Sequence, residues 1–153
     1  MTIGEMLLPE FDRETASTRK ILERVPEDKF AWKPHQKSST LGKLASHLAA
    51  IPGWAAVVVN GHGKKSPDAA SKAELLEVLD RNIAAGREAL ATANDDYLSQ
   101  NIRVGADLSK PRAAILRERL MSHMIHHRGQ LSVYLRLLDV AVPGMYGPSA
   151  DEK

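Results

Sequence analysis

Apolar residues recur at steps of three and four along four stretches of the chain, which is the spacing of one face of an α-helix. No stretch of useful length alternates between apolar and polar residues, as a half-buried strand would. The predicted helices span Thr2 to Arg24, Ser39 to Asn60, a segment from Ser71 to just before Thr92, and Pro111 to about Val140.

Polar residues at the ends of these stretches support the helix boundaries. Thr2 with Glu5, and Ser71 with Glu74, have the spacing of a capping box, in which each side chain satisfies a free backbone N–H group. Pro52 lies inside the second stretch and predicts a kink, because proline lacks the backbone donor. Four amphipathic helices predict an all-α fold, a four-helix bundle.

The length of 153 residues suits one domain with one core. We assign residues 1–142 to a single four-helix domain and residues 143–153, rich in Pro, Gly and charge, to a surface tail. The polar connection from Thr92 to Lys110 is long for a compact domain, so we expect it to be functional or partly helical.

Composition narrows the classes of function. The formal net charge is +2, too small to indicate a nucleic-acid partner. There is no cysteine, which excludes disulfides, thiolate zinc sites and a cysteine nucleophile. The longest apolar run, Leu48 to Val59, is too short to span a bilayer, and the N-terminus does not resemble a signal peptide. We therefore expect a cytoplasmic protein without membrane or nucleic-acid partners.

Three of the six histidines lie on predicted inward faces. His123 and His127 are four residues apart, so they share one helix face and could chelate one ion. His47 lies on the inward stripe of the second helix and could supply a third imidazole. Three imidazoles with an open fourth position form a catalytic type of metal site. The alternative, hydrogen-bonded core histidines, explains one such residue better than an inward pair.

The other histidines fit less well as ligands. His126 points about 100° away from His127 around the helix, so it is expected at the surface or supporting the ligands, as is Gln130. His35 and His62 fall in predicted loops and are expected to be exposed. The sequence has no His-Glu-x-x-His, Glu-x-x-His, Gly-x-Ser-x-Gly or Walker motif, so any chemistry must depend mainly on the metal.

Two segments resemble motifs of the DinB/YfiT-like metalloprotein superfamily. His123-Met-Ile-His-His127-Arg-Gly-Gln130, followed by Leu-Ser-Val-Tyr-Leu-Arg-Leu-Leu, is similar to the last-helix motif of DinB proteins. The segment from Trp32 to His47 is similar to the second-helix motif, and the ending from Val142 to Glu152 is also similar to that of the group. Together the resemblance spans nearly the whole chain.

The resemblance implies an up-down-down-up bundle in which His47, His123 and His127 hold nickel or zinc. It also implies a homodimer. Characterised members of the superfamily include thiol-dependent enzymes, such as mycothiol-dependent maleylpyruvate isomerase and bacillithiol transferases. We therefore expect a metal-dependent thiol transferase that acts on a small electrophile with an external thiol. A metal-dependent hydrolase and a non-catalytic metal-binding stress protein are the alternatives.

Two further expectations concern the surroundings of the ion. Tyr134 lies two turns beyond His127 on the same face, so it is a candidate catalytic residue, with a core aromatic as the other interpretation. We expect an apolar cleft lined by Trp54, Tyr134 and the Thr92–Lys110 connection. Trp54, Val57 and Val58 give the second helix more apolar surface than one core covers, which also favours a homodimer.

Overall fold

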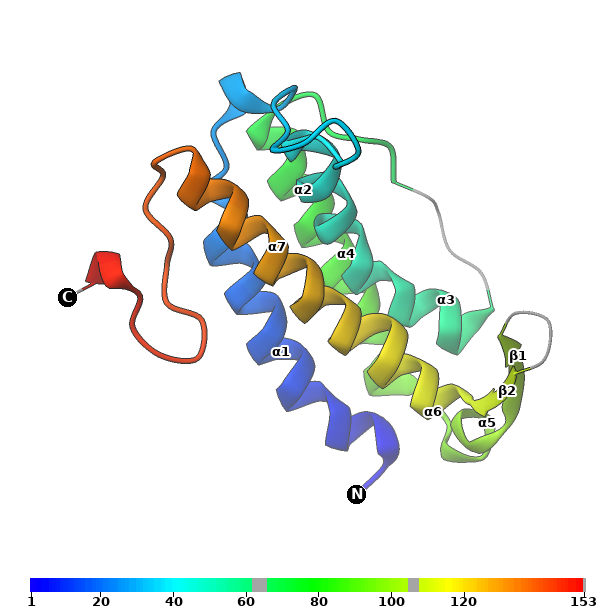
Figure 1. Cartoon of the computed structure of the whole chain (residues 1–153). Coiled ribbons are helices and arrows are strands. Elements are labelled where there is room, and N and C mark those ends of the chain that lie inside the picture. Colours follow the sequence, from blue (N-terminus) through cyan, green and yellow to red (C-terminus); the bar gives the residue numbers. More distant parts are fainter. Residues whose placement is uncertain (62–65, 105–107, 153) are drawn as a thin grey trace.

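Four long helical segments lie side by side and form the body of the protein in a computed structural model (Figure 1). The structure describes residues 1–61, 66–104 and 108–152. The longest helices are α1 (Ile3–Leu22), α4 (Lys72–Thr92) and α7 (His123–Leu137). The fourth segment consists of α2 (Leu41–Ala50) and α3 (Trp54–Asn60), joined by a 3-10 turn, η2 (Ile51–Gly53). The all-α prediction is therefore confirmed.

The predicted capping residues begin these helices. Thr2 accepts from the backbone N–H of Glu5 at 3.0 Å, while the Glu5 carboxylate accepts from the N–H of Thr2 at 2.8 Å. Ser71 accepts from the N–H of Glu74 at 3.1 Å and so caps α4. Each bond satisfies a donor that the first helical turn leaves free. After α1, a 3-10 turn, η1 (Glu27–Lys29), follows Pro26.

The second predicted helix is interrupted rather than only kinked. Pro52 lies in η2, where a tighter turn replaces the α-helical pattern because proline cannot donate a backbone hydrogen bond. The segment Leu41–Asn60 has a mean hydropathy of 1.2 and is long and apolar enough by composition to cross a membrane, but half of it is buried inside the protein. That burial is typical of a core helix.

The connection after α4 is partly helical, as expected, and it also contains two strands that the sequence pattern did not predict. It forms the short helix α5 (Asp95–Ser99) and the antiparallel strands β1 (Asn101–Val104) and β2 (Leu108–Pro111). Asn101 pairs with Pro111 and Ile102 with Lys110. The hairpin lies at one end of the bundle, beyond the end of α3 (Figure 1). Four-residue strands are too short to produce a clear alternating signal.

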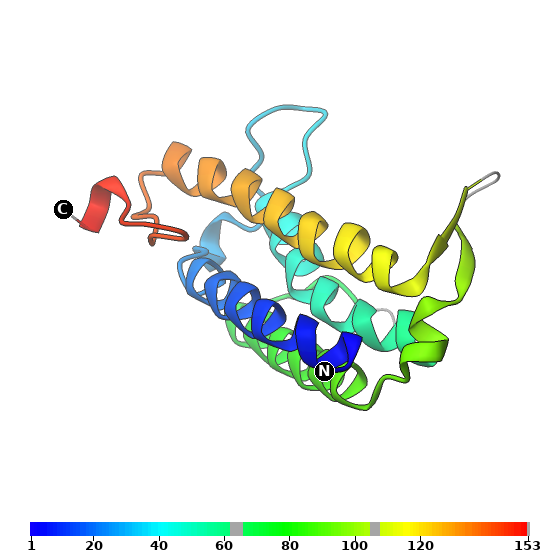
Figure 2. The same ribbon diagram turned by 90° about the horizontal axis from the view of Figure 1, so that it is seen from below.

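The last predicted helix is also divided. It begins as α6 (Arg112–Ile115), widens into the π-helical segment η3 (Leu116–Ser122), and continues as α7. It ends at Leu137, three residues before the predicted end, and Asp139 adopts a positive φ of 57°. The residues after it form a tail with a short 3-10 turn, η4 (Ala150–Glu152). Figure 2 shows this tail beside the C-terminal end of α7, away from the hairpin.

The core lies between α1, α2, α4 and α7, and its residues recur at helical spacing on each of them. On α4 Leu75 is fully buried, and its neighbour Leu76 is only partly buried. Fully buried side chains from all four segments meet here: Phe11, Ile21, Leu48, Ile51, Leu79, Leu131 and Leu135.

Gly86 lies at a close contact of α4 with its neighbours. A Cβ atom at this position would lie 2.3 Å from the carbonyl oxygen of Pro52 and 2.8 Å from the Phe11 ring. We expect Gly86→Ala to lower the free energy of unfolding by roughly 1–3 kcal/mol, because the backbone must move to admit the methyl group. Denaturant unfolding monitored by circular dichroism measures this change.

Gly129 offers a matched control. It also lies in a long helix, α7, but nothing is within 4 Å of the position a Cβ atom would take. Gly129→Ala should be neutral or stabilising by up to about 1 kcal/mol, since alanine favours a helix interior. Equal loss of stability in both variants would contradict the proposed close packing at Gly86.

Candidate metal centre

The structure brings together the three histidines that the sequence singled out. His47 comes from the last turn of α2, and His123 and His127 come from the first two turns of α7. Their candidate ligand nitrogens all lie within 4.8 Å of one another. All three are partly buried, at the contact between α2 and α7 rather than in the centre of the core. A bound ion there would be accessible to small molecules.

The spacing of the nitrogens fits a single ion. His123 Nε2 lies 3.0 Å from His47 Nε2 and 3.0 Å from His127 Nε2. Two nitrogens bound to a tetrahedral zinc ion at about 2.0–2.1 Å would be about 3.3 Å apart. The three rings are also nearly perpendicular, with interplanar angles of 81–87°, so their edges converge without stacking.

Hydrogen bonding alone does not account for this cluster. A ring nitrogen carries either one proton or one in-plane lone pair, so it forms one good hydrogen bond. His123 Nε2 faces two other Nε2 atoms at equal distance, and it can satisfy only one of them. Three lone pairs directed at one cation would satisfy all three nitrogens at once. The donor set therefore fits a divalent ion such as nickel or zinc.

Gln130 orients one of the candidate ligands. His127 Nδ1 lies 2.7 Å from Gln130 Oε1, and since the amide oxygen can only accept, Nδ1–H donates. This bond leaves the Nε2 lone pair of His127 directed at the cluster. Of the two supporting residues considered from the sequence, Gln130 makes a polar contact, whereas His126 is exposed and contributes only a ring contact to His127.

The site disfavours protons. Burial, followed by the positive charges that His127 and His47 would carry, lowers the pKa of His123 to about 4. Burial, followed by the charge of His127, also lowers the pKa of His47. Both rings are consequently neutral at neutral pH, which is the form that binds metal.

Two cavities adjoin the cluster, and His47 borders both. The larger, of about 370 Å³, is bordered by His47, His127, Gln130 and Tyr134, and by polar residues before and at the start of α2. The smaller, of about 170 Å³, is bordered by His47, Trp54, Asp68 and Asn82, among others. Trp54 also packs against the rings of His47 and His123, at centroid distances of 5.5 and 5.4 Å.

Part of the predicted cleft is wrong. Tyr134 and Trp54 line different cavities, and no described residue of the Thr92–Lys110 connection borders either one. That connection packs at the far end of the bundle against α1 and α6 instead. The larger cavity is mainly polar rather than apolar, because lysine, serine and glutamine side chains surround it.

Tyr134 packs as an aromatic residue and also faces a cavity. Its ring packs edge-on against Trp32 at a centroid distance of 5.7 Å, and its hydroxyl donates to the carbonyl of Ser39 at 3.1 Å. It also borders the larger cavity with His127. A catalytic role stays a prediction. The homodimer also stays a prediction. Of the three apolar residues on which it was based, Val57 is 42% exposed, while Trp54 and Val58 are partly buried.

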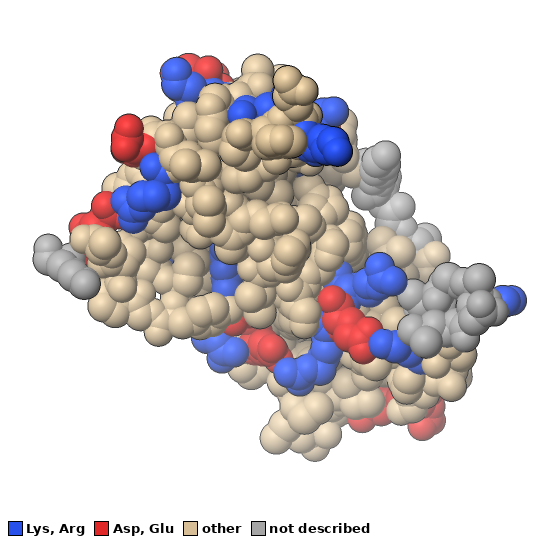
Figure 3. All heavy atoms as spheres, in the orientation of Figure 1, with Lys and Arg blue, Asp and Glu red and all other residues tan. Residues whose placement is uncertain are grey.

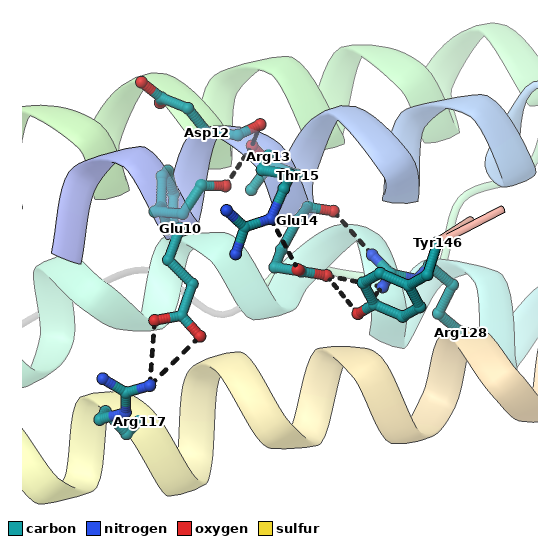
Figure 4. Close-up of polar contacts among 9 residues, drawn as sticks. Glu10, Asp12, Arg13, Glu14, Thr15, Arg117, Arg128 and Tyr146 are labelled. Atoms are coloured by element: carbon teal, nitrogen blue, oxygen red, sulfur yellow. Dashed lines mark hydrogen bonds and ion pairs between the residues drawn. The ribbon is translucent and has the colours of Figure 1, made fainter.

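A buried ion pair behind the site was missed from the sequence. Arg128, 2% exposed, donates to the Glu14 carboxylate at 2.6 Å and to its backbone carbonyl at 2.9 Å (Figure 4). The Tyr146 hydroxyl, from the tail, lies 2.8 Å from the same carboxylate. Burial would raise the pKa of Glu14, but the bonds from Arg128 and Tyr146 outweigh it and hold that pKa below its ordinary value.

The signal for this pair was present in the helical spacing. Arg128 continues the buried stripe formed by Met124, Leu131 and Leu135, and Glu14 lies between buried Phe11 and Thr18 on α1. Opposite charges at core positions of two helices predict a buried pair. Of the remaining histidines, His35 is exposed as expected, and His62 lies outside the described residues.

Replacing any one candidate ligand should remove the ion. We expect untagged wild-type protein to carry about one divalent ion per chain, and His47→Ala, His123→Ala and His127→Ala to lose most of it, because two imidazoles hold an ion far more weakly than three. Elemental analysis measures the content. His126→Ala is the matched control, since it removes an exposed neighbouring imidazole; unchanged metal in all three ligand variants would refute the site.

The metal-free protein should lose stability as the pH falls from about 6.5 towards about 4. Unfolded histidine takes up a proton near its ordinary pKa of 6.5, whereas folded His123 resists protonation down to a pKa of about 4. Between these values the unfolded state binds more protons, so acid favours unfolding. Thermal unfolding of metal-free protein at several pH values tests this. His123→Ala should flatten the dependence, and parallel curves for the two proteins would contradict it.

Comparison with known proteins identifies relatives in sequence and in fold. The sequence matches the DinB family over residues 2–153. A crystal structure of a DinB-like protein from Bacillus cereus ATCC 10987 is 28% identical, with a TM-score of 0.77, and the match covers 93% of this chain and 97% of that one. The DinB-like protein YjoA of Bacillus subtilis shares the fold at 18% identity and a TM-score of 0.73, over 97% and 98% of the two chains.

A sequence relative, the uncharacterised protein YrdA of Bacillus subtilis strain 168, is 26% identical over 149 residues. The match covers 95% of this chain and 89% of YrdA. The family match extends over almost every residue, including the three clustered histidines. The chain therefore belongs to the DinB family.

Proposed function

We propose that the protein uses one divalent ion, held by His47, His123 and His127, to transfer a low-molecular-weight thiol to a small electrophile. The observation that carries the proposal is the location of the three nitrogens beside two cavities, with His47 bordering both. Three protein ligands with an adjacent cavity are typical of catalytic sites, whereas structural sites have four protein ligands.

The chemistry follows from the charge of the donor set. When nickel or zinc is bound by three neutral imidazoles, its full double charge lowers the pKa of a bound thiol and so supplies a nucleophile at neutral pH. The thiol must come from outside, because the chain has no cysteine. In the transfer the S–H bond breaks and an S–C bond forms. The proton passes to the leaving group or, in an addition, to the carbon beside the new bond.

The residues around the cavities have supporting roles in this proposal. Gln130 keeps His127 in the tautomer whose Nε2 faces the cluster. The Tyr134 hydroxyl proton is engaged by Ser39, so its oxygen remains free to accept a hydrogen bond from a substrate. We therefore assign Tyr134 a role in positioning the substrate, with Trp54 forming an apolar wall of the smaller cavity.

The lining of the larger cavity favours transfer over hydrolysis. A hydrolase commonly uses a carboxylate as a general base beside the metal. Among the described residues that border the larger cavity there is no Asp or Glu, and Asp68 borders the smaller cavity instead. A thiol with a lowered pKa needs no such base, because it loses its proton on binding.

Two further parts of the proposal concern topology and location. We propose the up-down-down-up order of the superfamily; in Figure 1, α4 begins at the same end of the bundle as α2. We also propose a cytoplasmic location. The reducing cytoplasm keeps small thiols available, and the absence of cysteine is consistent with it.

Metal-loaded protein should accelerate the addition of a small thiol to an electrophile, and metal-free protein should not. His127→Ala should reduce the rate at least tenfold, because it removes one ligand and the Gln130 contact together. A panel of thiols and electrophiles, followed by loss of free thiol, measures the activity, with His126→Ala as control. Ester or amide hydrolysis without any thiol reaction would replace this proposal with the hydrolase.

A further inference from the structure

The larger cavity beside the metal centre has an unbalanced positive charge. Lys37 and Lys43 both border it, and neither ammonium group has an ion-pair or hydrogen-bond partner within residues 1–61, 66–104 and 108–152. Two lysines elsewhere differ: Lys110 pairs with Glu118 at 2.5 Å, and Lys72 donates to the carbonyl of Glu23. Figure 3 shows basic side chains, without acidic ones among them, over the loop before α2.

The positive charge of this cavity comes from side chains rather than from the end of α2. The first backbone N–H groups of α2 are already used: Leu41 donates to Trp32, Gly42 to Phe30, and Lys43 to the hydroxyl of Thr40. A ligand in the cavity would therefore meet the two ammonium groups and polar neighbours. The hydroxyls of Ser38 and Ser39 also have no hydrogen-bond partner in the described part of the chain.

The rest of the lining indicates how a ligand would lie. His47 and His127 border the cavity at the side of the metal centre, together with Gln130 and Tyr134. The volume of about 370 Å³ suits a small organic molecule. A ligand that reaches the ion from this side would thus have its other end beside the lysines. Two ammonium groups complement one or two carboxylates.

We propose that this cavity is a subsite for the carboxylate of a small organic anion, which Lys37 and Lys43 hold while its other end reaches the metal centre. The inference rests on the proposed function and names the class of molecule that it would accept. The carboxylate could belong to the thiol or to the electrophile. In both cases the lysines would bind a carboxylate. Only the thiol would carry a sulfur atom in the same molecule.

Calorimetric titration of zinc-loaded protein tests the subsite by binding, without an activity assay. The thiol arm compares 3-mercaptopropionate with neutral 2-mercaptoethanol. The electrophile arm compares succinate, an unreactive analogue of an unsaturated dicarboxylate, with neutral succinamide. We expect Lys37→Gln and Lys43→Gln each to weaken binding of the anion about fivefold, and the double variant about 25-fold, as for partly exposed ion pairs. Binding of the neutral molecules should not change.

Lys33→Gln is the matched control. It neutralises a lysine of the same loop whose ammonium group donates to the carbonyl of Gln36 and does not border the cavity. Metal content and circular dichroism of all variants should equal those of the wild type, because the three lysines are exposed. An equal effect of Lys33→Gln would overturn the subsite in favour of general surface charge.

The arms separate the possible outcomes. If the lysine variants bind 3-mercaptopropionate more weakly but bind succinate as the wild type does, the carboxylate belongs to the thiol. If they bind succinate more weakly but 3-mercaptopropionate as before, the carboxylate belongs to the electrophile. If neither thiol binds but binding of succinate depends on both lysines, the proposed thiol transfer is rejected and the proposed subsite is supported. If both thiols bind equally and neither anion responds to the double variant, the subsite is overturned and the thiol chemistry remains.

Discussion

The buried ion pair between Arg128 and Glu14 is the constraint on which the arrangement of α1 and α7 depends. Two charges at 2% exposure lose most of their hydration, and only close, well-directed bonds compensate for that loss. Arg128 makes two such bonds to Glu14 and a third to Tyr146. His127 precedes Arg128 in the chain, so the geometry that satisfies the guanidinium also sets the rotation of α7 that presents His127 to α2.

The metal centre has the opposite requirement. For the proposed function, its imidazoles must be buried enough to stay neutral and accessible enough to admit a substrate, and partial burial at the contact of α2 with α7 is compatible with both conditions. The tail adds to the support behind the site: Tyr146 reaches Glu14, and Asp151 accepts from Arg136 near the end of α7. The predicted surface tail is thus tied to the helix that carries two of the three histidines.

Much of the fold could be predicted because its signals are local. The capping pairs at Thr2 and Ser71 and the spacing of His123 and His127 depend on neighbours within one helical turn, which sequence spacing fixes. The third ligand, His47, needed the tertiary contact of α2 with α7 or a family resemblance. The Arg128–Glu14 pair, 114 residues apart, also depends on a tertiary contact, as does the position of the hairpin away from the site.

The π-helical segment η3 separates two parts of the last helix that serve different purposes. Each wide turn accommodates one residue more than an α-helical turn, so the segment is equivalent to an insertion absorbed within a helix. Deletion of one residue from η3 would rotate α6 and the hairpin by about 100° relative to α7. The residues from His123 onward would stay in place. Changes of length at the hairpin end can therefore arise during evolution without altering the register of the histidines.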